Sequence, residues 1–80
     1  MSAHAYISYD DVPAPLFDTA LRHGDGARYI AFDDCPFSGE ISRTSEGITQ
    51  IEYAWPNGLD LRHALGDWFT HHGIAFVVVP

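Results

Sequence analysis

Short segments of alternating apolar and polar residues dominate this chain, and they limit it to a fold built on a sheet of short strands. Four segments have this strand character, residues 3–9, 28–33, 40–44 and 48–55, and a fifth strand is expected at residues 74–79. Residues 45–47 between two of them, Ser-Glu-Gly, are typical of a hairpin turn. Residues 74–79 are apolar throughout, so we expect that strand to lie in the centre of the sheet, covered on both faces.

Two stretches have helical spacing instead. In the first, Asp10-Asp11 precede Pro13 and Pro15, which are tolerated only in a first helical turn, and a helix is expected to continue to His23-Gly24. In the second, Asn57 is expected to cap a helix, with Asp60 three residues later as in a capping box. That helix places these residues on one face: Leu61, Leu65, Trp68, Phe69 and His72.

The resulting order is β-α-β-β-β-α-β, which predicts an α+β fold: a mostly antiparallel sheet of about five strands with two helices packed on it. Eighty residues suffice for a single domain, residues 1–80. Cys35 is the one cysteine, so no internal disulfide can form. No apolar leader or membrane-length segment is present, and we expect a protein of the cytoplasm of a bacterial host cell.

The charge balance is the most informative part of the composition. Eleven Asp and Glu oppose four Arg and no Lys, and the formal net charge is −7. A surface of this sign repels nucleic acids and anionic membranes and attracts basic protein surfaces. We therefore expect a basic protein surface as partner, with no direct nucleic-acid or membrane binding, and a chain that is a monomer or a homodimer.

Connectivity predicts where this charge lies. If a helix returns the chain between the first two strands, those strands run in the same direction, and the residues that follow each one emerge at one rim of the sheet. Six carboxylates then share that rim with Trp55: Asp10, Asp11, Asp33, Asp34, Glu40 and Asp60. Three arginines are expected near the opposite rim: Arg22, Arg28 and Arg43. The acidic rim is the predicted partner-binding site, although each acid also suits a local role at a helix N-terminus or turn.

Catalytic and metal-binding patterns are weak by comparison. Five histidines are present, but none has the paired short spacing of a structural zinc site. Ser38, His63 and Asp34 could be drawn as a catalytic trio, yet no nucleophile-elbow pattern supports it. Nearby acids disfavour a Cys35 thiolate. We therefore expect no enzyme activity, no metal and no cofactor.

The paired acids Asp10-Asp11 and Asp33-Asp34, with Glu40 and Asp60 on a small domain without a catalytic motif, give the chain a resemblance in size and charge to small acidic anti-CRISPR proteins of phages and other mobile elements. The resemblance implies an inhibitor that occupies the basic nucleic-acid groove of a CRISPR effector, either as a DNA mimic or by ordinary protein docking. By the same resemblance, we expect the effector to be a Cascade-type complex that is blocked in target DNA binding. The resemblance carries no shared motif.

Two further functions remain open from the residues. One is an immunity protein or antitoxin that caps the basic active site of a nuclease toxin through the same electrostatics. The other is a homo-oligomeric accessory domain joined through exposed aromatic residues such as Phe37, Tyr53 and Trp55. A toxin gene beside this one would favour immunity, and neighbouring phage genes would favour the inhibitor.

Overall fold

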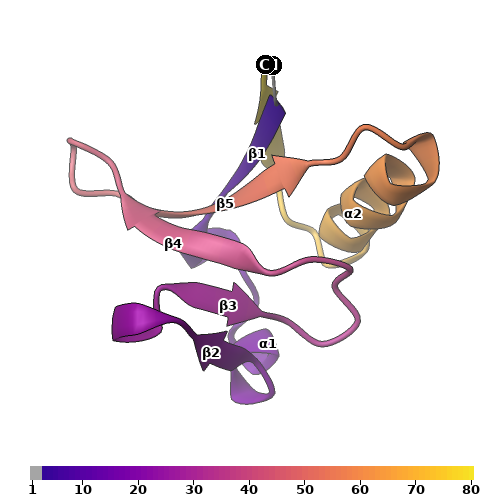
Figure 1. Cartoon of the computed structure of the whole chain (residues 1–80). Helices are drawn as coiled ribbons and strands as arrows, with labels where there is room; N and C mark the ends of the chain where they lie inside the picture. Colours follow the sequence, from indigo (N-terminus) through magenta and orange to yellow (C-terminus); the bar gives the residue numbers. More distant parts are fainter. Residues whose placement is uncertain (1–2) are drawn as a thin grey trace.

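A computed structural model describes residues 3–80 and shows one antiparallel sheet of six strands (Figure 1). The strands lie in the spatial order β2-β3-β4-β5-β1-β6, and every neighbouring pair is antiparallel. Their bounds are Ala3–Ser8 (β1), Leu21–His23 (β2), Tyr29–Ala31 (β3), Gly39–Arg43 (β4), Thr49–Trp55 (β5) and Phe76–Val79 (β6). The predicted α+β class and mostly antiparallel sheet are confirmed, with six strands where about five were expected.

The helices are α1 (Ala14–Asp18) and α2 (Leu59–His71), and two short 3-10 turns, η1 (Tyr9–Asp11) and η2 (Asp25–Ala27), join other elements. Both helices pack on the same face of the sheet. From α1, Phe17 makes an edge-on contact with Phe32, with ring centroids 5.5 Å apart. From α2, Phe69 makes a similar contact with Tyr53 at 5.3 Å. No helix of residues 3–80 is long and apolar enough to cross a membrane.

The first helix is much shorter than predicted. It ends at Asp18, and residues 21–23, expected to complete it, form strand β2 paired with β3. Gly24 and Gly26, at φ +83° and +67°, adopt the left-handed conformation that lets the chain reverse tightly between these strands. The extra hairpin reverses the direction of every strand that follows relative to the prediction.

The core lies between the helices and one face of the sheet. Its buried residues are Ala5, Ile7, Val12, Ile30, Phe32, Ile51, Tyr53, Leu65, Trp68, Phe69 and Ile74. Alternation in β1 and β5 points Ala5, Ile7, Ile51 and Tyr53 to this side. On α2, Leu65, Trp68 and Phe69 form one buried stripe as predicted, whereas Leu61, expected on the same face, is 48% exposed.

The two ends of α2 differ in how well they were predicted. Gly58 is the N-cap and no side chain caps it, so the expected capping box of Asn57 and Asp60 is wrong. At the other end, Gly73 adopts φ +70°, and its N–H and that of Ile74 donate to Thr70 and Phe69 carbonyls. This is the Schellman arrangement that a glycine at this position predicts.

Strand β6 lies at the edge of the sheet, not in its centre as predicted. It pairs with β1 alone, through residues 76–79. Val77 and Val79 are 63% and 45% exposed. The prediction from the apolar run was wrong because one edge of β1 is already paired with β5. The last strand pairs with the other edge of β1 and so becomes the outermost strand of the sheet.

No helix of residues 3–80 covers the second face of the sheet. The registers place one residue from each strand in a row across this open face: His23, Tyr29, Glu40, Glu52, Tyr6 and Val77. Glu40 and Glu52 are direct cross-strand neighbours, a like-charge pairing that is unfavourable by itself. Arg28 Nε lies 3.2 Å from the Glu40 carboxylate, and His4 Nδ1 lies 2.9 Å from that of Glu52, so each acid has its own partner.

Candidate docking surface

Four of the predicted site residues lie at one end of the sheet. β3 ends before Asp33 and Asp34, and β5 ends at Trp55, just before the α2 turn that carries Asp60. β3 and β5 run in the same direction, because each is antiparallel to β4. Figure 1 accordingly shows the β3–β4 loop and the β5–α2 connection on the same side of the sheet, away from the β4–β5 turn.

Asp10 and Asp11 lie at the opposite end, so the predicted six-carboxylate rim is wrong. They follow Ser8, which pairs with Gln50 at the start of β5, whereas Trp55 at its end pairs with Ala3. The added β2–β3 hairpin is the physical reason, since it makes β3 antiparallel to β1. Asp25 and Glu46 lie at that opposite end as well, in η2 and in the β4–β5 turn, so the expected strong polarisation is absent.

Glu40 belongs to neither end group. Its strand starts at the expected end, but its side chain lies on the open face beside Arg28. Arg28 itself was expected at the opposite rim from Glu40. Because residue 29 pairs with residue 40, the start of β3 is brought directly to the start of β4.

The remaining acids at this end lie on α2 or on the loop that is bonded to it. The indole N–H of Trp68 donates to the Asp33 carbonyl at 3.2 Å, which ties the β3–β4 loop to the helix. Asp67 follows Asp60 by seven residues, so both lie on one helix face about 10 Å apart. We call the four residues Asp33, Asp34, Asp60 and Asp67 the acidic α2 side. All four are exposed.

Asp67 was missed by the prediction because only residues near strand ends were considered. The seven-residue spacing from Asp60 was the available signal, since residues two turns apart share a helix face. Asp34 has a further constraint, because it sits at φ +61° in a turn closed by a hydrogen bond from Cys35 N–H to the Phe32 carbonyl. Asp and Asn tolerate this conformation better than most residues.

A groove of mixed polarity runs along α2 and reaches Asp67. Its volume is about 400 Å³, and it is lined by Trp55, Leu59, Arg62, His63, Gly66, Asp67, Thr70 and Phe76. Trp55 and Phe76 pack against each other with centroids 5.9 Å apart, and Leu59 is 66% exposed. Trp55, predicted to bind a partner, therefore presents an aromatic surface next to the acidic α2 side.

Few of the carboxylates are neutralised. Within residues 3–80, only Glu40 and Glu52 lie within ion-pair distance of a basic side chain. The other nine are all exposed: Asp10, Asp11, Asp18, Asp25, Asp33, Asp34, Glu46, Asp60 and Asp67. Three arginines bond neutral groups instead: Arg22 donates to the Tyr9 hydroxyl, Arg43 to the Gly47 carbonyl and Arg62 to the Pro56 carbonyl. Much of the negative charge is thus directed to solvent.

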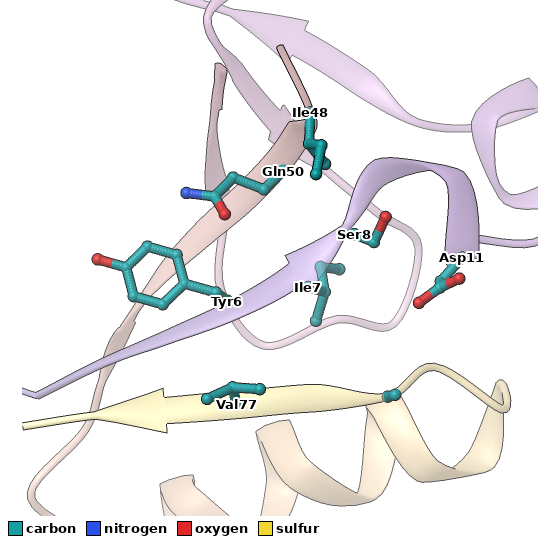
Figure 2. Close-up of a pocket in the computed structure, with 8 residues that line it drawn as sticks. Tyr6, Ile7, Ser8, Asp11, Ile48, Gln50 and Val77 are labelled. Atoms are coloured by element: carbon teal, nitrogen blue, oxygen red, sulfur yellow. The ribbon is translucent and has the colours of Figure 1, made fainter. Parts of the chain in front are cut away.

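A second depression, of about 270 Å³, lies where β1, β5 and β6 meet (Figure 2). Figure 2 shows Tyr6, Gln50 and Val77 on neighbouring strands along it, with Asp11 at its edge. Its lining is mostly apolar. Partial burial and the Glu52 carboxylate raise the pKa of the Tyr6 phenol, so this hydroxyl stays a neutral hydrogen-bond donor.

Side chains that could act as nucleophiles are poorly placed for it. The proposed trio of Ser38, His63 and Asp34 does not assemble around a hydrogen bond; Ser38 Oγ instead lies 3.3 Å from His23 Nε2, and both residues are exposed. Burial raises the pKa of the Cys35 thiol, which disfavours the reactive thiolate. Burial, with Cys35 nearby, also raises the pKa of Tyr53 above its ordinary range.

In the described part of the chain, no three His, Cys, Asp or Glu side chains gather as metal ligands would. Comparison with known proteins returns no match among family models, curated proteins or solved structures. The candidate docking surface therefore depends on its own geometry: four exposed carboxylates, one of which, Asp67, borders a groove that contains Trp55 and Leu59.

Proposed function

We propose that this chain is a non-enzymatic binding protein that docks its acidic α2 side onto a basic, nucleic-acid-binding surface of another protein. The observation that carries the proposal is the set of four exposed carboxylates along α2 and the loop that Trp68 holds against it, none of which has an ion-pair partner among residues 3–80. Carboxylates in this state attract Lys and Arg and steer a basic partner over distance. The groove at Trp55 and Leu59 adds an apolar contact next to the charges.

In its sharpest form, the proposal is that the partner is a Cascade-type CRISPR effector complex and that the chain blocks its binding of target DNA. The Lys and Arg that hold a nucleic-acid backbone would meet Asp33, Asp34, Asp60 and Asp67. The same surface could serve an immunity protein against a nuclease toxin, so the test includes a basic nuclease as a second arm.

The test compares two variants with the same change in charge. The first replaces the acidic α2 side with amides: Asp33→Asn, Asp34→Asn, Asp60→Asn and Asp67→Asn. The matched control replaces four acids at the opposite end: Asp10→Asn, Asp11→Asn, Asp25→Asn and Glu46→Gln. Asn keeps the size of Asp and its tolerance of the Asp34 backbone conformation, so both variants are expected to fold.

Target-DNA binding by a purified Cascade-type complex is measured by gel mobility shift with increasing amounts of each protein. The unmodified chain and the control should inhibit, and the α2-side variant should lose at least about tenfold in potency. Inhibition should also weaken between about 0.05 and 0.5 M salt, because salt screens exposed charges. Equal potency of the two variants would remove the acidic α2 side from the function. Inhibition of the nuclease alone would assign the chain to immunity.

A further inference from the structure

The outer edge of β6 is an unprotected strand edge. Phe76–Val79 pair with β1 on one side, and none of their backbone groups bonds to any other described element. Val77, Val78 and Val79 are 63%, 37% and 45% exposed. A row of free N–H and C=O groups flanked by apolar side chains is a template for pairing with another strand.

The other edge of the sheet is different. β2 has only three residues, and two of them, Arg22 and His23, are basic or titratable. Arg22 lies over the Tyr9 ring and donates to its hydroxyl. Short length and charge are the usual means by which a sheet edge avoids pairing. β6 has neither a charge nor a proline within it.

The distribution of charge indicates which strand pairs with the free edge of β6. Residues 74–80 contain no ionisable side chain, although the chain as a whole carries −7. Two copies of so acidic a chain repel over most of their surface, and the β6 edge gives them a neutral, apolar place to meet. We propose that β6 pairs antiparallel with β6 of a second copy, joining two six-stranded sheets into one sheet of twelve strands. This inference goes beyond the proposed function, because it uses none of the four acids on the α2 side.

The register of such a pair is limited. Opposite residues in an antiparallel pair point to the same face, so the twofold axis must pass at Val77 or at Val78. With the axis at Val77, Val77 pairs with Val77 of the second copy, and Phe76 pairs with Val78. With the axis at Val78, Val78 pairs with Val78 of the second copy, and Val77 pairs with Val79. Both registers bring only apolar side chains together, which favours pairing of the edge with itself.

The test is the mass of the full chain in solution, by light scattering after gel filtration from about 1 to 100 μM. The unmodified chain should reach twice the monomer mass of 8.9 kDa. Val77→Lys places like charges near the twofold axis and should raise the dissociation constant at least about tenfold. Leu21→Lys is the matched control, since Leu21 is 72% exposed on the β2 edge and the charge change is identical.

A mixture of Val77→Lys and Val77→Glu should recover a dimer, because opposite charges then meet across the seam. Circular dichroism confirms that each variant is folded. A monomer at every concentration would overturn the proposal. So would a Val77→Lys chain that dimerises like the unmodified one, or loss of the dimer in Leu21→Lys. Inhibition by the α2-side variant is measured separately, so failure of one proposal leaves the other intact.

Discussion

The same substitution, Gly to Ala, is expected to have opposite effects at two positions of this fold. Gly39 begins β4 on the core face of the sheet, opposite Ile30. A methyl group there would overlap Ile51 Cγ2 and lie 2.8 Å from Tyr53 Cζ. Carbon atoms in favourable contact are about 3.5–4.0 Å apart, so the ring would have to move by roughly 0.7 Å or more.

That movement is hard to absorb. Ile51 and Tyr53 are both 0% exposed, and Tyr53 is held edge-on against Phe69. Forcing an extra carbon into a close-packed core costs about 1–3 kcal/mol. For a domain of this size, each kcal/mol corresponds to about 4–8 °C in melting temperature, so Gly39→Ala should lower it by roughly 5–20 °C.

Gly66 lies inside α2, where a methyl group would be 3.7 Å from Phe76 Cζ, an ordinary contact. Replacing glycine by alanine within a helix gains up to about 1 kcal/mol, so Gly66→Ala should raise the melting temperature by roughly 4–8 °C. Thermal unfolding followed by circular dichroism measures both. Gly39→Ala at unchanged or raised stability would refute the packing described for β4, and a lowered melting temperature for Gly66→Ala would refute the open contact described for α2.

The remaining predictions concern Tyr53 and Trp68. The Tyr53 hydroxyl is buried and has no hydrogen-bond partner within the described residues, so Tyr53→Phe should stabilise the fold by about 1 kcal/mol at pH 7 in urea titrations. Burial raises the pKa of this phenol in the folded chain, whereas in the unfolded chain it ionises near pH 10, so its contribution to stability is retained below about pH 10 and lost above it. Tyr53→Phe should reduce the loss of stability above about pH 10. Equal losses in the two proteins would contradict the raised pKa of Tyr53. Trp68→Phe removes the bond to the Asp33 carbonyl, so amide exchange at residues 33–35 should accelerate; unchanged exchange would mean that this bond does not hold the loop.

Local patterns predicted much of the fold correctly. Alternation and one apolar run identified five of the six strands, with every end within two residues of the observed one. The buried stripe of α2 and the glycine that ends it also followed from the sequence, because helical spacing and left-handed backbone are properties of neighbouring residues.

The acidic rim failed for a different reason. It depended on the direction of whole strands, and one unrecognised three-residue strand, β2, was enough to reverse β3. So short a segment has no periodicity of its own; Leu21, Arg22 and His23 continue the spacing of the preceding helix as well as they form a strand. Pairing with β3 decides between the two, and that pairing joins residues six to ten positions apart in the chain.

The sequence by itself determined that this chain is strongly acidic and has a sheet with an apolar core, because charge and alternation are carried by individual residues and their near neighbours. Only the tertiary structure decided which carboxylates lie together, that the most apolar strand lies at an exposed edge and that one sheet face is left open. Those features depend on strand order, and strand order is set by pairings between distant segments that no local pattern contains.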